Sequence, residues 1–328
     1  MIRAALLLGL IGLACATALF VREGFTAILA AFAAAGWGIL WTSLFHVVPM
    51  GLNARAWQLL LPPRRRPSWL YFGWCVWVRE AVNGLLPVAR IGGEVVSARL
   101  LMHRGVHPAP AVATLVVDVT VSLVSQASFT LLGLALAALA EIDEGFLIDI
   151  AVGLVAALPV MAAAAFAQKF GLFGIFARIF RALFSVFGDR FAGMVGGAAM
   201  LDRAVRRLYR RMSSVFACGL WQLAGWVAGA GEIWIALYFL KSPIDFNSAI
   251  IIEALVQAVG STAFVIPGAL GVQEGSFLLI GGMLGLPADI ALALALTRRA
   301  RDVIVFVPAL AAWQYSVGRR LVSRGRRA

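Results

Sequence analysis

Long apolar runs, separated by short polar stretches, follow one another along almost the whole chain. A transmembrane helix needs about 20 mainly apolar residues, and runs near this length recur from end to end. The first run begins after Arg3 and is followed directly by Arg22; it is long for the apolar part of a signal peptide, which favours a membrane span. The pattern predicts full spans at Ala4–Val21, Gly24–Asn53, Ala109–Ala140, Ile150–Gln168, Ser213–Leu240 and Ala288–Gly318.

Two further apolar stretches are interrupted by proline and glycine in the same way. "PVARIGGE" (Pro87–Glu94) and "PGALGVQE" (Pro267–Glu274) share the pattern P-x6-E. Proline removes a helix hydrogen bond and glycine permits a turn, so neither stretch can be an uninterrupted helix. Such backbone is tolerated at membrane depth only inside protein or against a water-filled cavity, and a matching pair points to a transporter-type site. The broken-helix motif comprises Pro87, Gly92, Gly93, Pro267, Gly268 and Gly271.

The distribution of Lys and Arg predicts which loops face the cytoplasm. Arg64–Arg66 and the C-terminal arginines mark the inside, whereas the acidic Glu141–Asp149 stretch marks the outside. The first broken segment lies between inside loops and the second begins at the outer loop Lys241–Phe246. We therefore expect an all-α polytopic membrane protein with about six full transmembrane helices and two re-entrant broken-helix hairpins in inverted arrangement. Both termini would be cytoplasmic, and the alternative is about eight spans, two of them kinked.

A basic segment, residues 169–213, is the one sizeable stretch without a predicted span. It holds nine Lys and Arg against two Asp. A stripe of phenylalanines at helical spacing favours either a helix in the cytoplasmic membrane interface or a helix packed on the bundle, and both interpretations stay open. The arginines of "RAVRRLYRR" would contact anionic lipid or set the orientation. The stripe consists of Phe170, Phe173, Phe176, Phe180, Phe184, Phe187 and Phe191.

The composition supports a membrane protein and argues against other classes. The chain has 328 residues, of which 62% are hydrophobic and only 13% charged. Soluble domains carry about 25% charged residues. The net charge of +12 fits loops that face anionic lipid, and no nucleic-acid partner is expected. We expect residues 1–328 to form a single integral-membrane domain without a soluble catalytic domain.

No motif in the sequence predicts a metal, a cofactor or a catalytic centre. The three cysteines lie in apolar runs, and His103 and His107 are interpreted as interfacial loop residues. His103 and His107 are four residues apart, but no acid or cysteine lies nearby to complete a zinc site. Nucleophile, zinc-protease and nucleotide-binding motifs are also missing from the sequence. The prediction is therefore no cofactor, no metal and no enzymatic activity.

Many charged residues lie in or beside the predicted spans. Each costs roughly 2.5–3.5 kcal/mol at the bilayer centre unless it is paired or faces a wet cavity. Arginine grips phosphate with a planar fork, and helix N-termini after the two prolines add positive dipole ends. An anionic headgroup is the expected ligand, and purely structural ion pairing is the alternative. The expected substrate-binding residues are Arg79, Glu80, Asn83, Arg90, Glu94, Asp118, Glu274, Arg298, Arg299, Arg301 and Asp302.

Three stretches resemble a known family: "REAVNGLLPVARIGGEVVSARLL", "VVDVTVSL" and "PGALGVQEGSF". They are similar to the transmembrane domain of lysylphosphatidylglycerol synthases, most of all to the stand-alone, hopanoid-biosynthesis-associated (HpnL-type) branch. The resemblance implies lipid translocation or service in a lipid pathway. Lipid aminoacylation is not carried over, because the chain ends without the soluble transfer domain of those synthases. The matching positions are Arg79, Glu80, Asn83, Pro87, Gly93, Glu94, Pro267, Gly268, Gly271 and Glu274.

The leading functional prediction is a lipid translocator of the bacterial inner membrane, with the headgroup in the cavity and the tails in the bilayer. The alternative is an integral-membrane enzyme or accessory subunit of hopanoid or glycolipid modification. The expected partners are a membrane lipid substrate, anionic lipid at the basic segment, and either a second copy of the chain or lipid-biosynthesis proteins. We further expect Glu94 and Glu274 to approach each other and the arginines of the last span near the bilayer midplane.

The orientation can be tested by cysteine accessibility on intact cells. A cysteine placed in the Glu141–Asp149 stretch should react with a membrane-impermeant reagent, whereas one at Ala328 should react only after permeabilisation. Labelling of Ala328 in intact cells would contradict the predicted topology.

Overall fold

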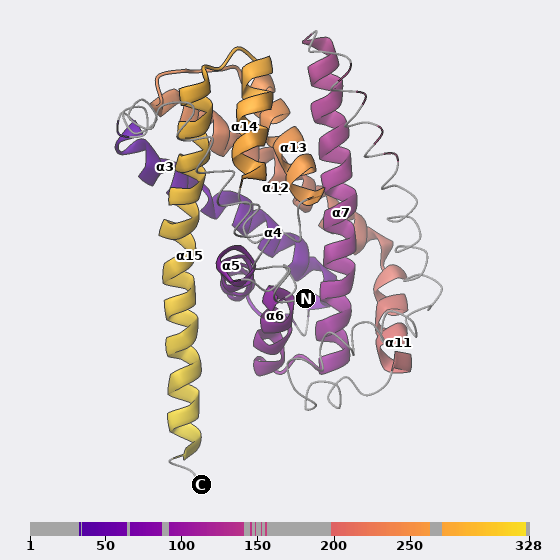
Figure 1. Ribbon diagram of the computed structural model, residues 1–328. Helices are drawn as coiled ribbons and strands as arrows, with labels where there is room; N and C mark the ends of the chain where they lie inside the picture. The colour runs from indigo at the N-terminus through magenta and orange to yellow at the C-terminus, as the bar shows by residue number, and fades with distance from the viewer. Residues whose placement is uncertain are drawn as a thin grey trace.

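The computed structural model describes residues 35–63, 66–86, 92–140, 198–262 and 271–325, with a few single positions at 33 and between 145 and 155. Helices are the regular secondary structure of these ranges, which contain no strand, so the all-α prediction is confirmed (Figure 1). In chain order they are α3 (Gly38–Phe45), α4 (Val47–Leu60), α5 (Trp69–Leu85), α6 (Gly92–His103), α7 (Pro108–Leu139), α11 (Ala198–Tyr209), α12 (Met212–Phe239), α13 (Phe246–Thr262), α14 (Val272–Met283) and α15 (Ala288–Gly325).

Helices α3 and α4 follow each other with a break at His46. Pro49 has no N–H to donate to the preceding turn, which explains an interruption at this point. α4 then continues to Leu60, so the prediction that a loop begins at Asn53 is wrong. The reason is an apolar face that continues past Asn53, on which Trp57 and Leu60 are fully buried.

Helices α5 and α6 form a hairpin. The Tyr71 hydroxyl donates to the carbonyl of Leu100 at 2.7 Å, and the backbone N–H of Gly93 donates to the Asn83 side chain at 2.8 Å. The start of α5 therefore lies beside the end of α6, and the end of α5 beside the start of α6. Their 17 and 12 residues correspond to about 25 and 18 Å of helix, less than the roughly 30 Å of a bilayer core. Neither helix alone is long enough to cross this core, and the re-entrant arrangement stays a prediction.

Helices α13 and α14 repeat this unit, again with 17 and 12 residues. Each unit ends in the same turn, with a left-handed glycine at φ +80° in Gly105 and +78° in Gly285, 180 positions apart (285 − 105). In both turns the next residue donates its N–H back to the end of the short helix, Val106 to Leu101 and Leu286 to Gly281. The same interval separates the two prolines and the two glutamates of the P-x6-E pattern.

The two units are inverted relative to each other. Figure 1 shows α6 at the end of the molecule where α7 begins, and α14 at the opposite end where α15 begins. The long helices α7 and α15 consequently run in opposite directions. Each hairpin packs on the long helix of the other half, α5 on α15 and α13 on α7, while α4 and α12 cross between them. We call α3–α7 the first half and α11–α15 the second half.

The apolar core follows the same division. One cluster of buried side chains joins α4, α5 and α6 around Trp57 and Phe72. A second joins α12, α13 and α14 around Ile252 and Phe277. Within the described residues, α7 is the one helix long and apolar enough, by length and composition alone, to cross a membrane. The number of full crossings stays a prediction.

The basic segment is described only at its end. α11 packs on α7 through the buried Leu201 and Val205, and Arg206 and Arg207 face outward. α11, α6 and the end of α15 lie at one end of the molecule, whereas α7 ends at the other (Figure 1). The Phe170–Phe191 stripe, the Ile150–Gln168 span and most of the Glu141–Asp149 stretch lie outside the described residues.

The α5–α6 hairpin depends on a glycine at its closest point. A Cβ on Gly93 would collide with the backbone carbonyl of Arg79 and with the Asn83 side chain. Gly93→Ala should lower stability by roughly 1–3 kcal/mol, as overpacking does. Gly73→Ala on α5 is the matched control, because nothing lies within 4 Å of the added methyl group. Thermal unfolding in detergent would contradict the packing if Gly93→Ala melted at or above Gly73→Ala.

Candidate functional site: a chain of ion pairs between the halves

A first group of charges joins α5, α6, α7 and α12. The Arg79 guanidinium lies 2.8 Å from the Asp118 carboxylate and 3.8 Å from Glu94. Its carbon lies 5.4 Å from the centre of the Trp57 ring, a cation–π distance. Asp118 is fully buried and also accepts a hydrogen bond from Gln222 at 2.9 Å. Arg79 therefore pairs with acids of α7 and α6.

Glu94 is only partly satisfied in this group. Asn83 donates to its Oε1 at 3.3 Å, while the buried Oε2 accepts no hydrogen bond among the described residues. The expectation that Glu94 pairs with arginines of the last helix is wrong, because α6 lies against α5 and α7 rather than against α15. Arg90, Pro87, Pro267 and Gly268 fall outside the described residues.

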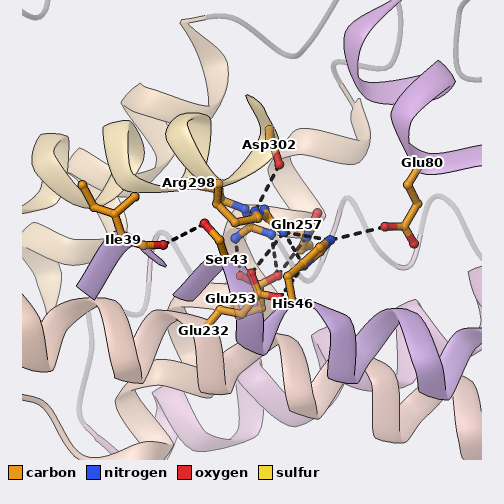
Figure 2. A network of polar contacts seen from close by, with 10 residues as sticks. Ile39, Ser43, His46, Glu80, Glu232, Glu253, Gln257, Arg298 and Asp302 are labelled. Carbon is orange, nitrogen blue, oxygen red and sulfur yellow. Dashed lines mark hydrogen bonds and ion pairs between the residues drawn. The ribbon is translucent and has the colours of Figure 1, made fainter. Parts of the chain in front are cut away.

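A second group, which we call the His46 network, consists of His46, Glu80, Glu232, Arg301 and Asp302. His46 Nδ1 lies 2.7 Å from Glu232 and Nε2 lies 3.3 Å from Glu80. Arg301 lies 3.1 Å from Glu232 and 3.1 Å from Asp302. Figure 2 shows Glu80 reaching the imidazole from one side, with Glu232 on the other. These contacts bring α5, α12 and α15 together at the junction of α3 and α4.

The neighbouring pair Glu253–Arg298 extends the network onto α13 (Figure 2). Arg298 binds the carboxylate with both terminal nitrogens, at 2.5 and 2.9 Å, a bidentate arrangement. Gln257 donates to the same carboxylate at 2.9 Å. The Arg298 guanidinium also lies 5.9 Å from the centre of the Phe277 ring on α14.

Glu274 and Arg299 form a third group where α14 meets α15. Arg299 Nε lies 3.0 Å from Glu274 Oε1, and Oε2 of the same carboxylate accepts the backbone N–H of Gly271 at 2.8 Å. The expected position of Glu274 beside the arginines of the last helix is confirmed. Arg299 Nη2 is buried and has no hydrogen-bond partner among the described residues. Among the described residues, no carboxylate oxygen accepts a hydrogen bond from this Nη2 group.

An apolar groove of about 950 Å³ lies along α12, next to the His46 network. Its walls include Phe45 of α3 and Val227, Trp234 and Phe246 of α12 and α13. Asp245, in the loop before α13, also lines the groove. The Ser248 hydroxyl and nearby backbone N–H groups donate to this carboxylate and hold its pKa below the usual range. The groove and the charges thus lie on different faces of one helix.

The structure identifies participants that the sequence analysis left out of the site. His46 was not among the predicted site residues, yet it lies inside the helical bundle between two carboxylates. Glu232 and Glu253 are buried acids that complete the pairs of Arg301 and Arg298. One signal was available for His46: it is a single titratable residue in the otherwise uncharged run Gly24–Asn53. Within the described residues no group of three or more His, Cys, Asp or Glu side chains could hold a metal ion.

Comparison with known proteins identifies the family. The model of the lysylphosphatidylglycerol synthase transmembrane region matches residues 1–309. The chain belongs to this family. Searches of curated proteins and of solved structures gave no match. Membership supports an α-helical membrane protein with a lipid-related role, and the ion pairs lie within the matched region.

Removal of one partner of the Glu253–Arg298 pair should cost far more stability than removal of both. Glu253→Gln leaves a buried guanidinium without its counter-charge, which costs about 3–5 kcal/mol. The double variant Glu253→Leu/Arg298→Met removes both charges and should recover most of that loss. Asp302→Asn is the control, because Asp302 is partly exposed and its removal should cost about 1 kcal/mol or less. Unfolding of the purified protein in mixed micelles measures all three, and a double variant no more stable than Glu253→Gln would contradict the pairing.

Proposed function

We propose that the protein moves an amphipathic lipid between the leaflets of the bacterial inner membrane. The observation that carries the proposal is the pair of inverted hairpins, each presenting one glutamate to an arginine, Glu94 to Arg79 and Glu274 to Arg299. Inverted repeats with broken helices build alternating-access sites in many transporters. Buried ionisable residues in such a bundle mark the route of polar substrates or ions.

The headgroup would bind at Arg299. Arg298 and Arg301 already have carboxylate partners on their terminal nitrogens. Arg299 alone among these three keeps a buried terminal nitrogen without a hydrogen-bond partner in the described chain. An anionic oxygen, such as that of a lipid phosphate, is the ligand that a guanidinium binds best. An anionic headgroup is therefore the substrate class that we propose.

The lipid tails need an apolar surface while the headgroup crosses. The groove along α12 supplies such a surface beside the charged interior. The sequence has no nucleotide-binding motif, so translocation would be passive or coupled to an ion gradient. The hopanoid-associated branch, cytoplasmic termini, anionic lipid at the α11 arginines, and a second copy or lipid-biosynthesis proteins as partners belong to the same proposal.

The second candidate is an accessory subunit or an enzyme of lipid modification. It is favoured by the description of the family, which is that of the membrane region of a synthase. Chemical change of the lipid separates the two candidates, since translocation leaves the lipid intact.

A leaflet assay with purified protein in liposomes tests the proposal. Vesicles carry a trace of fluorescent phosphatidylglycerol, and dithionite bleaches only the outer leaflet. Wild-type protein should expose the inner-leaflet probe without altering it. Glu274→Gln and Arg299→Gln should each slow this step about tenfold, the effect of roughly 1.4 kcal/mol on a barrier. Asp289→Asn, an acid on the same helix outside the ion pairs, is the matched control.

The outcome is decisive in each direction. Wild-type vesicles that bleach no further than empty ones would refute translocation of this probe. Folded Glu274→Gln and Arg299→Gln proteins that both act at the wild-type rate would refute the site. A modified lipid recovered from the vesicles would favour the enzyme candidate.

A further inference from the structure

His46 lies at the place where the two halves of the molecule meet. It connects α3 to α4 in the first half and contacts Glu80 on α5 of the same half. On its other side it contacts Glu232 on α12 and Arg301 on α15, both in the second half. The ring also packs edge-on against Phe306 at 5.7 Å. The proposed lipid site at Arg299 uses none of these contacts.

The carboxylates of Glu80 and Glu232 are both acceptors, so two hydrogen-bond donors are needed to satisfy them. A neutral imidazole carries a single N–H and can donate to only one of Glu80 and Glu232, whereas an imidazolium can donate to both. Glu80 belongs to the first half and Glu232 to the second. The proton on His46 therefore decides whether the ring donates to both carboxylates or to only one of them. Arg301 Nη1 also faces the ring, at 2.5 Å from Nδ1, and can donate only to a ring nitrogen that carries no proton.

The charges around the ring favour the protonated imidazole over the neutral one. Three carboxylates belong to the network, Glu80, Glu232 and Asp302, against the single guanidinium of Arg301. With a neutral ring the network has a net charge of about −2, and with an imidazolium about −1. Arg298 and Glu253 on α13, the next charges along (Figure 2), cancel each other. Buried net charge is costly, so the proton offsets part of that cost.

The side chains of the His46 network differ in how much of their surface is exposed. The side chains of Glu232 and Arg301 are 8% and 5% exposed, while Glu80 and Asp302 are 25% and 24% exposed. His46 itself is 12% exposed. Glu80, which contacts Nε2, is therefore the more exposed of the two acids beside the ring.

From this geometry we infer that His46 is a proton-binding site that couples lipid translocation to the proton gradient. The proton comes from water, is held on the imidazole between Glu80 and Glu232, and returns to water when the bridge opens. Binding ties α5 to α12 and release separates them, so one change of conformation accompanies each protonation. The coupling rests on the proposed translocation, whereas the proton site itself does not.

Nitrogen-15 NMR of histidine-labelled protein in nanodiscs tests the site directly. The chain has three histidines, so the His103→Gln/His107→Gln background leaves His46 as the single signal. The ring nitrogens should change from imidazolium to neutral shifts within about pH 5–8, the range in which histidine charge acts as a switch. One unchanged protonation state across this range would overturn the inference. This measurement needs no His46 variant and no lipid substrate.

The liposome assay with fluorescent phosphatidylglycerol tests the coupling. The wild-type rate should depend on pH over the same range, and His46→Gln should make the rate independent of pH. His103→Gln is the matched control and should keep the wild-type profile. A pH-independent wild-type rate would refute the coupling while leaving translocation intact. Failure of the wild type to move the probe at any pH would refute translocation, whereas the NMR titration would still decide the proton site.

Discussion

The burial of charge between helices is the constraint on which the rest of the structure depends. In an apolar bundle the burial of an isolated ionised side chain costs a large free energy. Each buried charge must therefore pair with an opposite charge from another helix. Arg79 reaches Asp118 across α5 and α7, and Arg298 reaches Glu253 across α15 and α13. Because these bonds are directional, they fix the depth and rotation of each helix, which apolar packing alone specifies poorly. In the function proposed above, the same groups that orient the bundle would bind the headgroup and the proton.

The repeat reuses one scaffold with different charges. Asp118 and Arg298 occupy equivalent places, 180 positions apart (298 − 118), on the two long helices. The acid on α7 is met by a cation from the hairpin of its own half, and the cation on α15 by an acid from α13. Both pairs are satisfied, although the long helix carries the acid in one pair and the cation in the other. Pairing, rather than the sign of a particular residue, is therefore what the scaffold requires at this depth.

Local features of the structure could be predicted from the sequence, whereas the pairing of distant helices could not. Proline and glycine act on their own turn of backbone, so the breaks between α5 and α6 and between α13 and α14 follow directly from the sequence. Glu274 was expected beside the last helix and lies there. Glu94 was assigned the same partner by analogy, but α6 packs beside α7, which offers Asp118 and no arginine at that level. His46 was missed because a neutral-looking residue in an apolar run shows its role only through Glu80 and Glu232, which come from distant parts of the chain.

The inversion is incomplete, and the departure lies on α15. Where α15 carries Arg299, Arg301 and Asp302, the equivalent positions of α7 are Val119, Val121 and Ser122. Two inverted halves with the same side chains would give inward-open and outward-open states of equal energy, because exchange of the halves interconverts them. Charges on one long helix remove this equality, since only one arrangement places Arg301 against Glu232 and His46. In the proposed translocator, the ion pairs of α15 would thus give the two states different energies, and a change of one charge within them would shift the balance between the states.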